Sequence, residues 1–191
     1  MKEYVVFKII IFMLNSYANV STKDLSHQSK CHLLDVAHHV HNMAYDSDGH
    51  LNEHRLKTIL AIGYKESKFN FLGLDSIVSK HGACGIYQQV PKYTAEPLSC
   101  DELHDSEIAT RQVIKATDEI FHRHNFKLLK ICEYNSGPKC NNGSERYARD
   151  FLKKYDAISK MIDGTHKKFN VFDEHDEYKH SELVEICESG C

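Results

Sequence analysis

The sequence predicts a predominantly helical α+β protein with one main domain. Apolar residues recur at steps of three and four over residues 30–45, 54–67 and 144–162, which is the period of an amphipathic helix. Residues 68–104 differ, because their glycines and prolines break any long periodic run. The chain has 191 residues. At that length one domain buries roughly 70% of its unfolded surface and folds without a metal or a disulfide.

Two helices are expected before the irregular stretch. In the first, over residues 30–45, the apolar side chains share one face, which predicts a helix with one buried side. That face consists of Leu33, Leu34, Ala37, Val40 and Ala44. In the second, over residues 54–67, apolar residues are nearly continuous. This indicates a helix that is buried on most sides and delivers Glu66 at its end.

Three more helices are expected later in the chain. The third begins at Asp105 or Ser106, either of which can cap the free backbone amides. The fourth covers residues 126–134 and stops at the turn signal Asn135-Ser136-Gly137-Pro138. The fifth, residues 144–162, has an apolar stripe of Tyr147, Phe151, Tyr155, Ile158 and Ile162. Residues 68–104 are long for a connection, so we expect a functional region there, with short strands.

The chain divides into three parts. Residues 1–18 are expected to be a secretion signal, because an apolar core at Ile9–Leu14 precedes the small residues of Ser16-Tyr17-Ala18. The alternative is a frayed N-terminal helix. Residues 25–162 are the main domain, and residues 163–191 are a polar tail that contains cysteine.

Seven cysteines are many for this length, and export would let them form disulfides. Cys132 and Cys140 flank a turn and can close a loop around it, while Cys187 and Cys191 can anchor the tail. The odd count leaves at least one thiol free or bonded to another chain. Sequence alone leaves the connectivity open.

Neither a metal site nor a nucleic-acid surface is expected. The cysteine spacing lacks the Cys-x-x-Cys pattern of zinc sites. We interpret the fourteen histidines, including the neighbours His38, His39 and His41, as solvated surface residues. The net charge of −3 argues against a nucleic-acid binder, as does the lack of a basic patch with interleaved aromatic residues.

Glu66 is the leading catalytic candidate. A carboxylic acid that emerges from an apolar helix keeps its proton more readily, because poor solvation disfavours the charged form. A general acid needs that proton to give to a leaving group. A surface carboxylate at a helix C-terminus would be electrostatically disfavoured, so the placement of Glu66 calls for an explanation.

Three motifs follow one another: Glu66-Ser67, then Gly82-Ala83-x-Gly85-x-x-Gln88, then Tyr134-Asn135-x-Gly137. In this order they resemble the motifs of lytic transglycosylases, in the group of soluble lytic transglycosylases and goose-type lysozymes. Tyr147-Ala148-x-x-Phe151 is similar to the helix that follows in that family. The resemblance covers roughly residues 50–156.

This resemblance implies a lysozyme-like fold and cleavage of the β-1,4 bond between N-acetylmuramic acid and N-acetylglucosamine in peptidoglycan. It also implies that the enzyme needs no metal or organic cofactor. Glu66 would protonate the leaving oxygen and then, as a base, take the proton of the muramic acid C6 hydroxyl, which leaves a 1,6-anhydro end. Because the attacking hydroxyl belongs to the same sugar, one carboxylate can serve both steps.

Six more residues are expected to bind substrate or support the acid: Ser67, Gly85, Gln88, Tyr134, Asn135 and Tyr147. A glycine such as Gly85 lets the backbone approach a sugar closely, and Gln88 offers both a donor and an acceptor. Tyr134 can hold the carboxylate through its hydroxyl or stack on a sugar. Asn135 can bond a sugar or only fix the turn. Tyr147 lies on the apolar stripe, so core packing is an open alternative for it.

The match is imperfect between Glu66 and Gly85, where the chain is a few residues longer than expected. Asp75 lies in this extra segment, and a second carboxylate there would position water and turn the reaction into hydrolysis. A hydrolytic lysozyme is therefore the alternative activity. A non-catalytic glycan-binding protein with the same fold is the alternative class. Cys84 and Tyr87 also depart from the family pattern.

The expected partner is the glycan strand of peptidoglycan, bound by a monomer. We expect a secreted, periplasmic or envelope-associated enzyme. A secretion system or a phage particle is a possible setting, since both must pass the cell wall.

Overall fold

The computed structural model describes the backbone of residues 1–72, 78–94, 96–123, 127–137, 139–166, 169, 180–185 and 187–188. Residues 22, 121–123 and 127–129 are described by their backbone alone. The helices are α1 (Glu3–Ala18), α2 (His27–Met43), α3 (Glu53–Ser67), α4 (Cys100–His104), α5 (Ser106–Arg123), α6 (Lys127–Ser136) and α7 (Asn142–Ile162). Three short 3-10 turns cover Thr22–Asp24, Lys68–Asn70 and Pro91–Tyr93. The predominantly helical class is thus confirmed.

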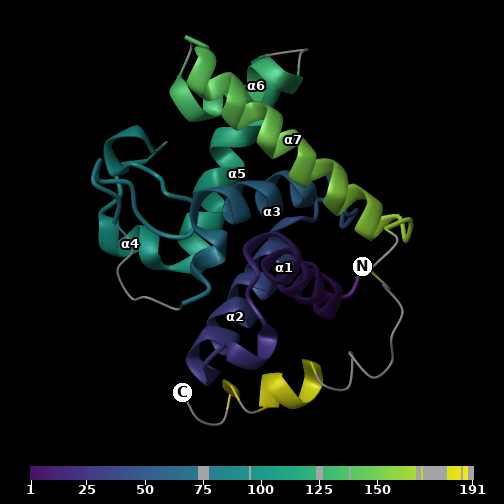
Figure 1. The fold of residues 1–191 in the computed structure, drawn as a ribbon. Coiled ribbons are helices and arrows are strands. Elements are labelled where there is room, and N and C mark those ends of the chain that lie inside the picture. The colour runs from purple at the N-terminus through teal and green to yellow at the C-terminus, as the bar shows by residue number, and fades with distance from the viewer. Residues whose placement is uncertain are drawn as a thin grey trace.

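Helix α3 lies at the centre of the molecule and contacts α1, α2, α5 and α7 (Figure 1). It begins at an N-cap, Asn52, whose side chain accepts a hydrogen bond of 2.9 Å from the amide of Arg55. Between Leu56 and Tyr64 every residue is buried. Burial on all sides explains why the sequence of this helix is almost continuously apolar instead of periodic.

Gly63 allows two aromatic rings to pack directly on α3. A Cβ atom at this position would lie 2.9 Å from the ring of Phe69 and 3.1 Å from that of Tyr87. Both rings are fully buried. The glycine in the middle of the helix is therefore required by packing, at a modest cost in helix propensity.

The segment expected to be a secretion signal forms helix α1 and packs into the core. Val6, Ile9, Ile10 and Met13 are fully buried in a cluster that includes side chains of α2 and α3. None of the described helices is long and apolar enough to cross a bilayer. Cleavage after Ala18 would remove all of this packing. The secretion signal remains a prediction.

The described part of residues 68–104 holds no extended strand, so the expected strands are not seen there. Isolated bridges join Val78 to Cys84 and Cys84 to Gln89. The second bridge closes a tight turn, in which the amide of each residue donates to the carbonyl of the other at 2.8 and 3.0 Å. Positive φ at Gly85 and Gln88 reverses the chain within this turn. The pairing does not extend beyond the bridge, because Pro91 has no amide hydrogen to donate and begins a 3-10 turn.

Three disulfides join described residues: Cys31–Cys187, Cys84–Cys100 and Cys132–Cys140. The last is the loop closure anticipated from the sequence. Cys187 does anchor the tail, and its partner is Cys31 of α2. Cys191 lies outside the described residues.

The tail also contacts α1. Phe169 is buried against the ring of Phe12, with centroids 5.3 Å apart, and His180 lies against Phe7 at 5.6 Å. The disulfide to Cys31 and these ring contacts hold the described parts of the tail against the α1–α2 side of the molecule.

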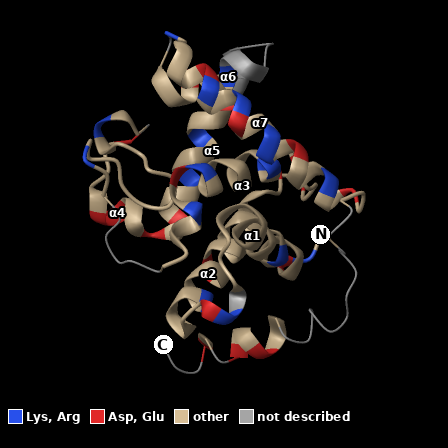
Figure 2. Ribbon diagram, viewed as in Figure 1, with Lys and Arg blue, Asp and Glu red and all other residues tan. Residues whose placement is uncertain are grey.

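The expected helices agree with the observed ones to within a few residues, and α4 is an additional short helix. In its capping box the Ser99 side chain accepts from the Glu102 amide at 3.2 Å, and the Glu102 side chain accepts from the Ser99 amide at 2.7 Å. Charged side chains of both signs are interspersed along α7 (Figure 2). Of the three neighbouring histidines expected to be solvated surface residues, His38 is exposed and bonds Glu3 at 2.9 Å, whereas His39 and His41 are half-buried.

Candidate functional site

The chain turns sharply directly after Glu66. Lys68, Phe69 and Asn70 all have positive φ, between 49° and 60°, which is rare for residues other than glycine. The carbonyl of Phe69 is bonded by His32 Nε2 at 3.0 Å, so α2 helps to hold the turn. Strained backbone of this kind persists where the surrounding structure fixes it, and it is found often at functional sites.

Ser67 connects the end of α3 to the turn between Cys84 and Gln89, which contains Gly85 and is called the glycine-containing turn below. Its hydroxyl donates to the carbonyl of Ile86 at 2.6 Å and accepts from the amide of Asn70 at 3.0 Å. The first and second sequence motifs therefore meet here. The serine is engaged with the backbone in this structure, and its expected contact with a sugar remains a prediction.

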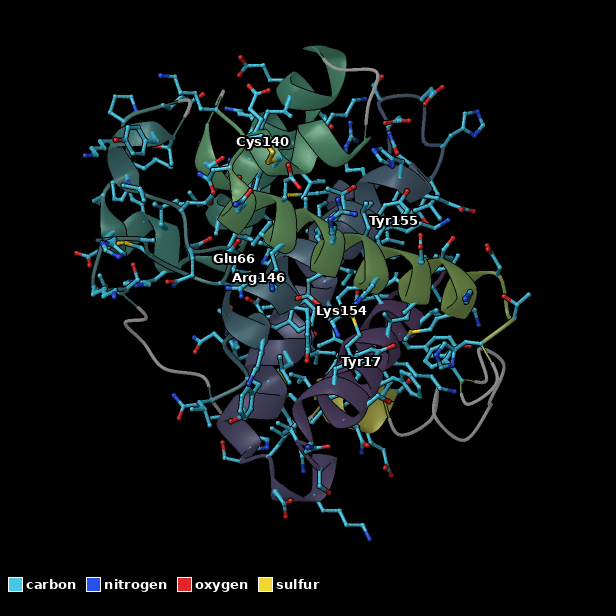
Figure 3. All side chains as sticks on the ribbon, turned by 45° about the horizontal axis from the view of Figure 1, so that its top comes forward. Tyr17, Glu66, Cys140, Arg146, Lys154 and Tyr155 are labelled. Atoms are coloured by element: carbon cyan, nitrogen blue, oxygen red, sulfur yellow. A yellow bond between two sulfur atoms is a disulfide. The ribbon has the colours of Figure 1, made fainter. Side chains whose placement is uncertain are left out.

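Glu66 is bonded by Tyr147, the tyrosine for which the sequence left core packing open. The Tyr147 hydroxyl donates to Glu66 Oε1 across the contact between α3 and α7. Helix α7 presents this hydroxyl because its start is fixed by Asn141, whose side chain accepts from the amides of Gly143 and Ser144 at 2.9 and 3.1 Å. Figure 3 shows Glu66 beside the beginning of α7.

Burial raises the pKa of Glu66 above its ordinary value of 4.5, because the charged form is poorly solvated. The hydrogen bond from Tyr147 and the positive charge of Lys65 act in the opposite direction and limit the rise. The carboxyl group thus combines a raised pKa with a donor that stabilises its ionised form. These are the properties required of a group that first gives a proton and later takes one.

Tyr134 and Tyr87 line the acid's surroundings from α6 and from the glycine-containing turn. Burial raises the pKa of Tyr134 well above its usual value, and the negative charge of Glu66 adds to the effect. Tyr87 is fully buried and bonds Thr110 Oγ1 at 3.1 Å. The sequence left Tyr134 two roles, to hold the carboxylate or to stack on a sugar. The hydroxyl that bonds Glu66 is that of Tyr147, and stacking of Tyr134 on a sugar remains a prediction.

The turn that carries Gly85 and Gln88 is fixed against α4. A Cβ atom on Gly85 would lie only 1.8 Å from the carbonyl oxygen of Leu103, so no other residue fits without displacing backbone. The disulfide Cys84–Cys100 holds the same contact. Gln88 Nε2 donates to the carbonyl of Gly85 at 3.0 Å and closes the turn. Its expected contact with a sugar remains a prediction.

Asn135 lies near the end of α6 and is exposed. The turn that follows has Gly137 at φ 71°, and the disulfide Cys132–Cys140 spans it. Asn135 is thus accessible to a ligand, while the turn itself is closed by other groups. Asp75, the candidate for positioning water, lies outside the described residues.

Sequence reasoning missed an ion pair beside the acid. Lys65, the residue before Glu66, donates to Asp150 of α7. One signal was present in the sequence: Asp150 follows Tyr147 by three residues and so lies on the same side of a helix. Only the packing of α3 on α7 shows that Lys65 reaches it.

One group of described residues has metal-ligand character: His27, Cys31 and Cys187. The two cysteines are joined in a disulfide, so their sulfur atoms carry no thiolate to offer a metal. His27 Nε2 lies 3.6 Å from Cys31 Sγ. The group forms part of the tail anchor.

Comparisons with protein-family models, with curated proteins and with solved structures gave no significant match.

Proposed function

We propose that the protein is a peptidoglycan lytic transglycosylase with a lysozyme-like fold. The observation that carries the proposal is the environment of Glu66: a largely buried carboxyl group with a raised pKa, bonded by Tyr147, at the point where α3 meets the glycine-containing turn. The three sequence motifs that resemble the family's come from separate parts of the chain. Their meeting around one carboxyl group supports a shared role.

In the proposed reaction Glu66 gives its proton to the glycosidic oxygen as the bond from C1 of N-acetylmuramic acid to that oxygen breaks. Positive charge develops at C1. The C6 hydroxyl of the same sugar then forms the new bond to C1, and its proton passes to the Glu66 carboxylate. The acid is thereby regenerated, and the strand ends in 1,6-anhydromuramic acid without consuming water.

Tyr147 would support both halves of this cycle. After the first proton transfer its hydroxyl donates to the carboxylate and stabilises the charge, as a hydrogen bond to the charged form does. Burial raises the pKa of Tyr147 well above its usual value, and the negative charge of Glu66 is the next cause. The phenol therefore keeps its proton and remains a donor.

The disulfides support an exported enzyme. Three of them join described residues, and disulfides form and persist in oxidising compartments outside the cytosol. We propose peptidoglycan strands as the partner and the periplasm, the cell envelope or the medium as the location.

The test is digestion of purified peptidoglycan sacculi by the purified protein and by Glu66→Gln. We expect the substitution to reduce the release of soluble muropeptides by roughly 10²–10⁴-fold, because it removes the transferable proton. Glu53→Gln is the matched control: the same change at the other end of α3, on an exposed residue that pairs with Lys57. Equal activity of wild type and Glu66→Gln would contradict the proposal. Binding to sacculi without release by the wild type would indicate a glycan-binding protein.

A further inference from the structure

The ion pair between Lys65 and Asp150 crosses from α3 to α7 directly beside the candidate acid. Lys65 precedes Glu66, and Asp150 lies about one helical turn after Tyr147. The Lys65 ammonium donates to Asp150 Oδ2, and the two side chains are 26% and 41% exposed. On the surface of a protein such a pair contributes little to stability. Its position therefore invites another explanation.

The same ammonium group contacts the tyrosine that bonds the acid. Lys65 Nζ lies 5.4 Å from the centroid of the Tyr147 ring, within the range of a cation–π interaction. The Tyr147 hydroxyl in turn donates to Glu66. Asp150 thus holds Lys65, Lys65 lies over the ring of Tyr147, and Tyr147 bonds the acid.

A second cation lies beyond this chain of contacts. Lys154 is placed 3.8 Å from the ring centroid of Tyr17 and 5.3 Å from that of Tyr64 (Figure 3). Its charge acts on Asp150, whose pKa is lowered chiefly by the hydrogen bond from Lys65, with smaller contributions from the charges of Lys65 and Lys154. Asp150 is therefore ionised and stays paired with Lys65.

We propose that Lys65 and Asp150 are a positioning pair for Glu66, which fixes the ring of Tyr147 and places a paired cation beside the acid. This inference rests on the proposed function for its catalytic consequence. The cation alone would favour the charged carboxylate and weaken the acid's hold on its proton. Asp150 reduces the effect of that charge, so the pair orients Tyr147 while the pKa of Glu66 stays raised.

The other described groups near the acid include Arg146, an exposed cation that precedes Tyr147 on α7, and several tyrosines (Figure 3). Tyr147 on α7, Tyr134 on α6 and Tyr87 in the glycine-containing turn face Glu66 or one another, and burial raises the pKa of each, so all three stay neutral. Tyr64 on α3 has its pKa raised to about 12, mainly by burial and then by the charge of Asp150. Lys65 is the cation that acts on Glu66 directly.

Substitution of the two members of the pair should shift the pKa of Glu66 in opposite directions. In Asp150→Asn the charge of Lys65 is no longer offset, so the pKa of Glu66 falls. In Lys65→Gln the Asp150 carboxylate is left unpaired, so the pKa of Glu66 rises. Each shift should be roughly half a pH unit, the size expected for a single charge in partly exposed surroundings. A clamp that only joins α3 to α7 would not produce shifts of opposite sign.

The experiment is a ¹³C NMR titration of the Glu66 carboxyl group in the full chain, with the signal assigned by its loss in Glu66→Gln. Asp156→Asn serves as the control, because Asp156 is an exposed acid on the same helix. Lys65→Arg keeps the charge and should stay close to wild type. Opposite shifts in Asp150→Asn and Lys65→Gln support the proposal. No shift, or shifts of one sign, overturns it.

The same variants separate this proposal from the proposed function. With sacculi as substrate, both should lower kcat by roughly threefold to tenfold with little change in KM, because Tyr147 is less well oriented. The alkaline limb of the pH profile should move in the direction of the NMR shift. If the wild type releases no muropeptides, the proposed function fails, while the titration still decides whether the pair acts on Glu66.

Discussion

The surroundings of Glu66 and of helix α1 are held together by different interactions. Beside Glu66 the interaction is a partly buried polar pair, in which the Tyr147 hydroxyl donates to the acid. Around α1, Val6, Ile9 and Ile10 are fully buried in an apolar cluster. Apolar burial depends on area and tolerates many sequences, whereas a buried carboxyl group depends on particular partners. Chemistry is therefore expected at the first region, and stability at the second.

The largest effect is expected in the apolar region. Ile10→Ala should lower the free energy of unfolding by about 2–5 kcal/mol, because it leaves a cavity in the core. Thermal or denaturant unfolding measures this loss. Ile11→Ala is the neighbouring control, since Ile11 is only partly buried and should cost less. If Ile10→Ala leaves the stability of the purified protein unchanged, α1 is not part of its folded core.

Gly85 combines the two kinds of requirement. It belongs to the candidate site, but it must be a glycine because of packing. Gly85→Ala should cost about 1–3 kcal/mol, because its Cβ would lie 1.8 Å from the carbonyl oxygen of Leu103. Gly82→Ala is the matched control: φ is +76° there, close to the +70° of Gly85, and nothing lies within 4 Å of the added atom. The difference in unfolding free energy between the two variants isolates the clash. Equal losses would mean that backbone conformation alone matters.

Removal of the Tyr147 hydroxyl should change the activity and its pH dependence. Tyr147→Phe deletes a hydrogen bond that favours ionised Glu66, so the pKa of Glu66 should rise and the alkaline limb of activity should move to higher pH. Activity at the optimum should fall about tenfold. Tyr155→Phe removes a comparable hydrogen bond, 2.7 Å long to His54, from the same helix. That control should affect stability without moving the pH limb; a shift of similar size in both variants would contradict the assignment.

The smallest effect is a gain in stability. Because the pKa of Glu66 is raised on folding, the unfolded chain releases this proton more readily, so wild-type stability falls as pH rises from about 4.5 through the folded pKa. Glu66→Gln does not undergo this loss. Its unfolding free energy should therefore exceed that of wild type at neutral pH and match it below pH 4. A difference in unfolding free energy between Glu66→Gln and wild type that grows toward acid pH would contradict this prediction.

Much of the helical framework was predictable because its cause is local. The periodic stripe of Tyr147, Phe151 and Tyr155 predicted α7, and the continuous apolar run before Glu66 predicted a buried α3. The expectation of strands in residues 68–104 was wrong for the described part of that stretch. There, the pairing ends at the bridge between Cys84 and Gln89, because Pro91 just beyond it begins a 3-10 turn.

The remainder depends on packing between distant segments. The contact of Lys65 with Asp150 joins residues 85 positions apart, and Cys31–Cys187 joins residues 156 positions apart. No local pattern encodes either one. The sequence indicated two tyrosines near the acid, but only the approach of α7 to α3 selects Tyr147 as the donor. The requirement for Gly63 likewise arises from Phe69 and Tyr87, which pack on it from outside the helix.

The central claim, that Glu66 serves as acid and then base with the sugar's own hydroxyl as the attacking group, is tested most directly by product mass. Sacculi are digested by the purified protein in water enriched in ¹⁸O, and the released muropeptides are weighed by mass spectrometry. The account predicts 1,6-anhydromuramic ends, lighter by one water and free of ¹⁸O, which disappear in Glu66→Gln. Reducing ends that carry ¹⁸O would contradict it and assign the protein as a hydrolase.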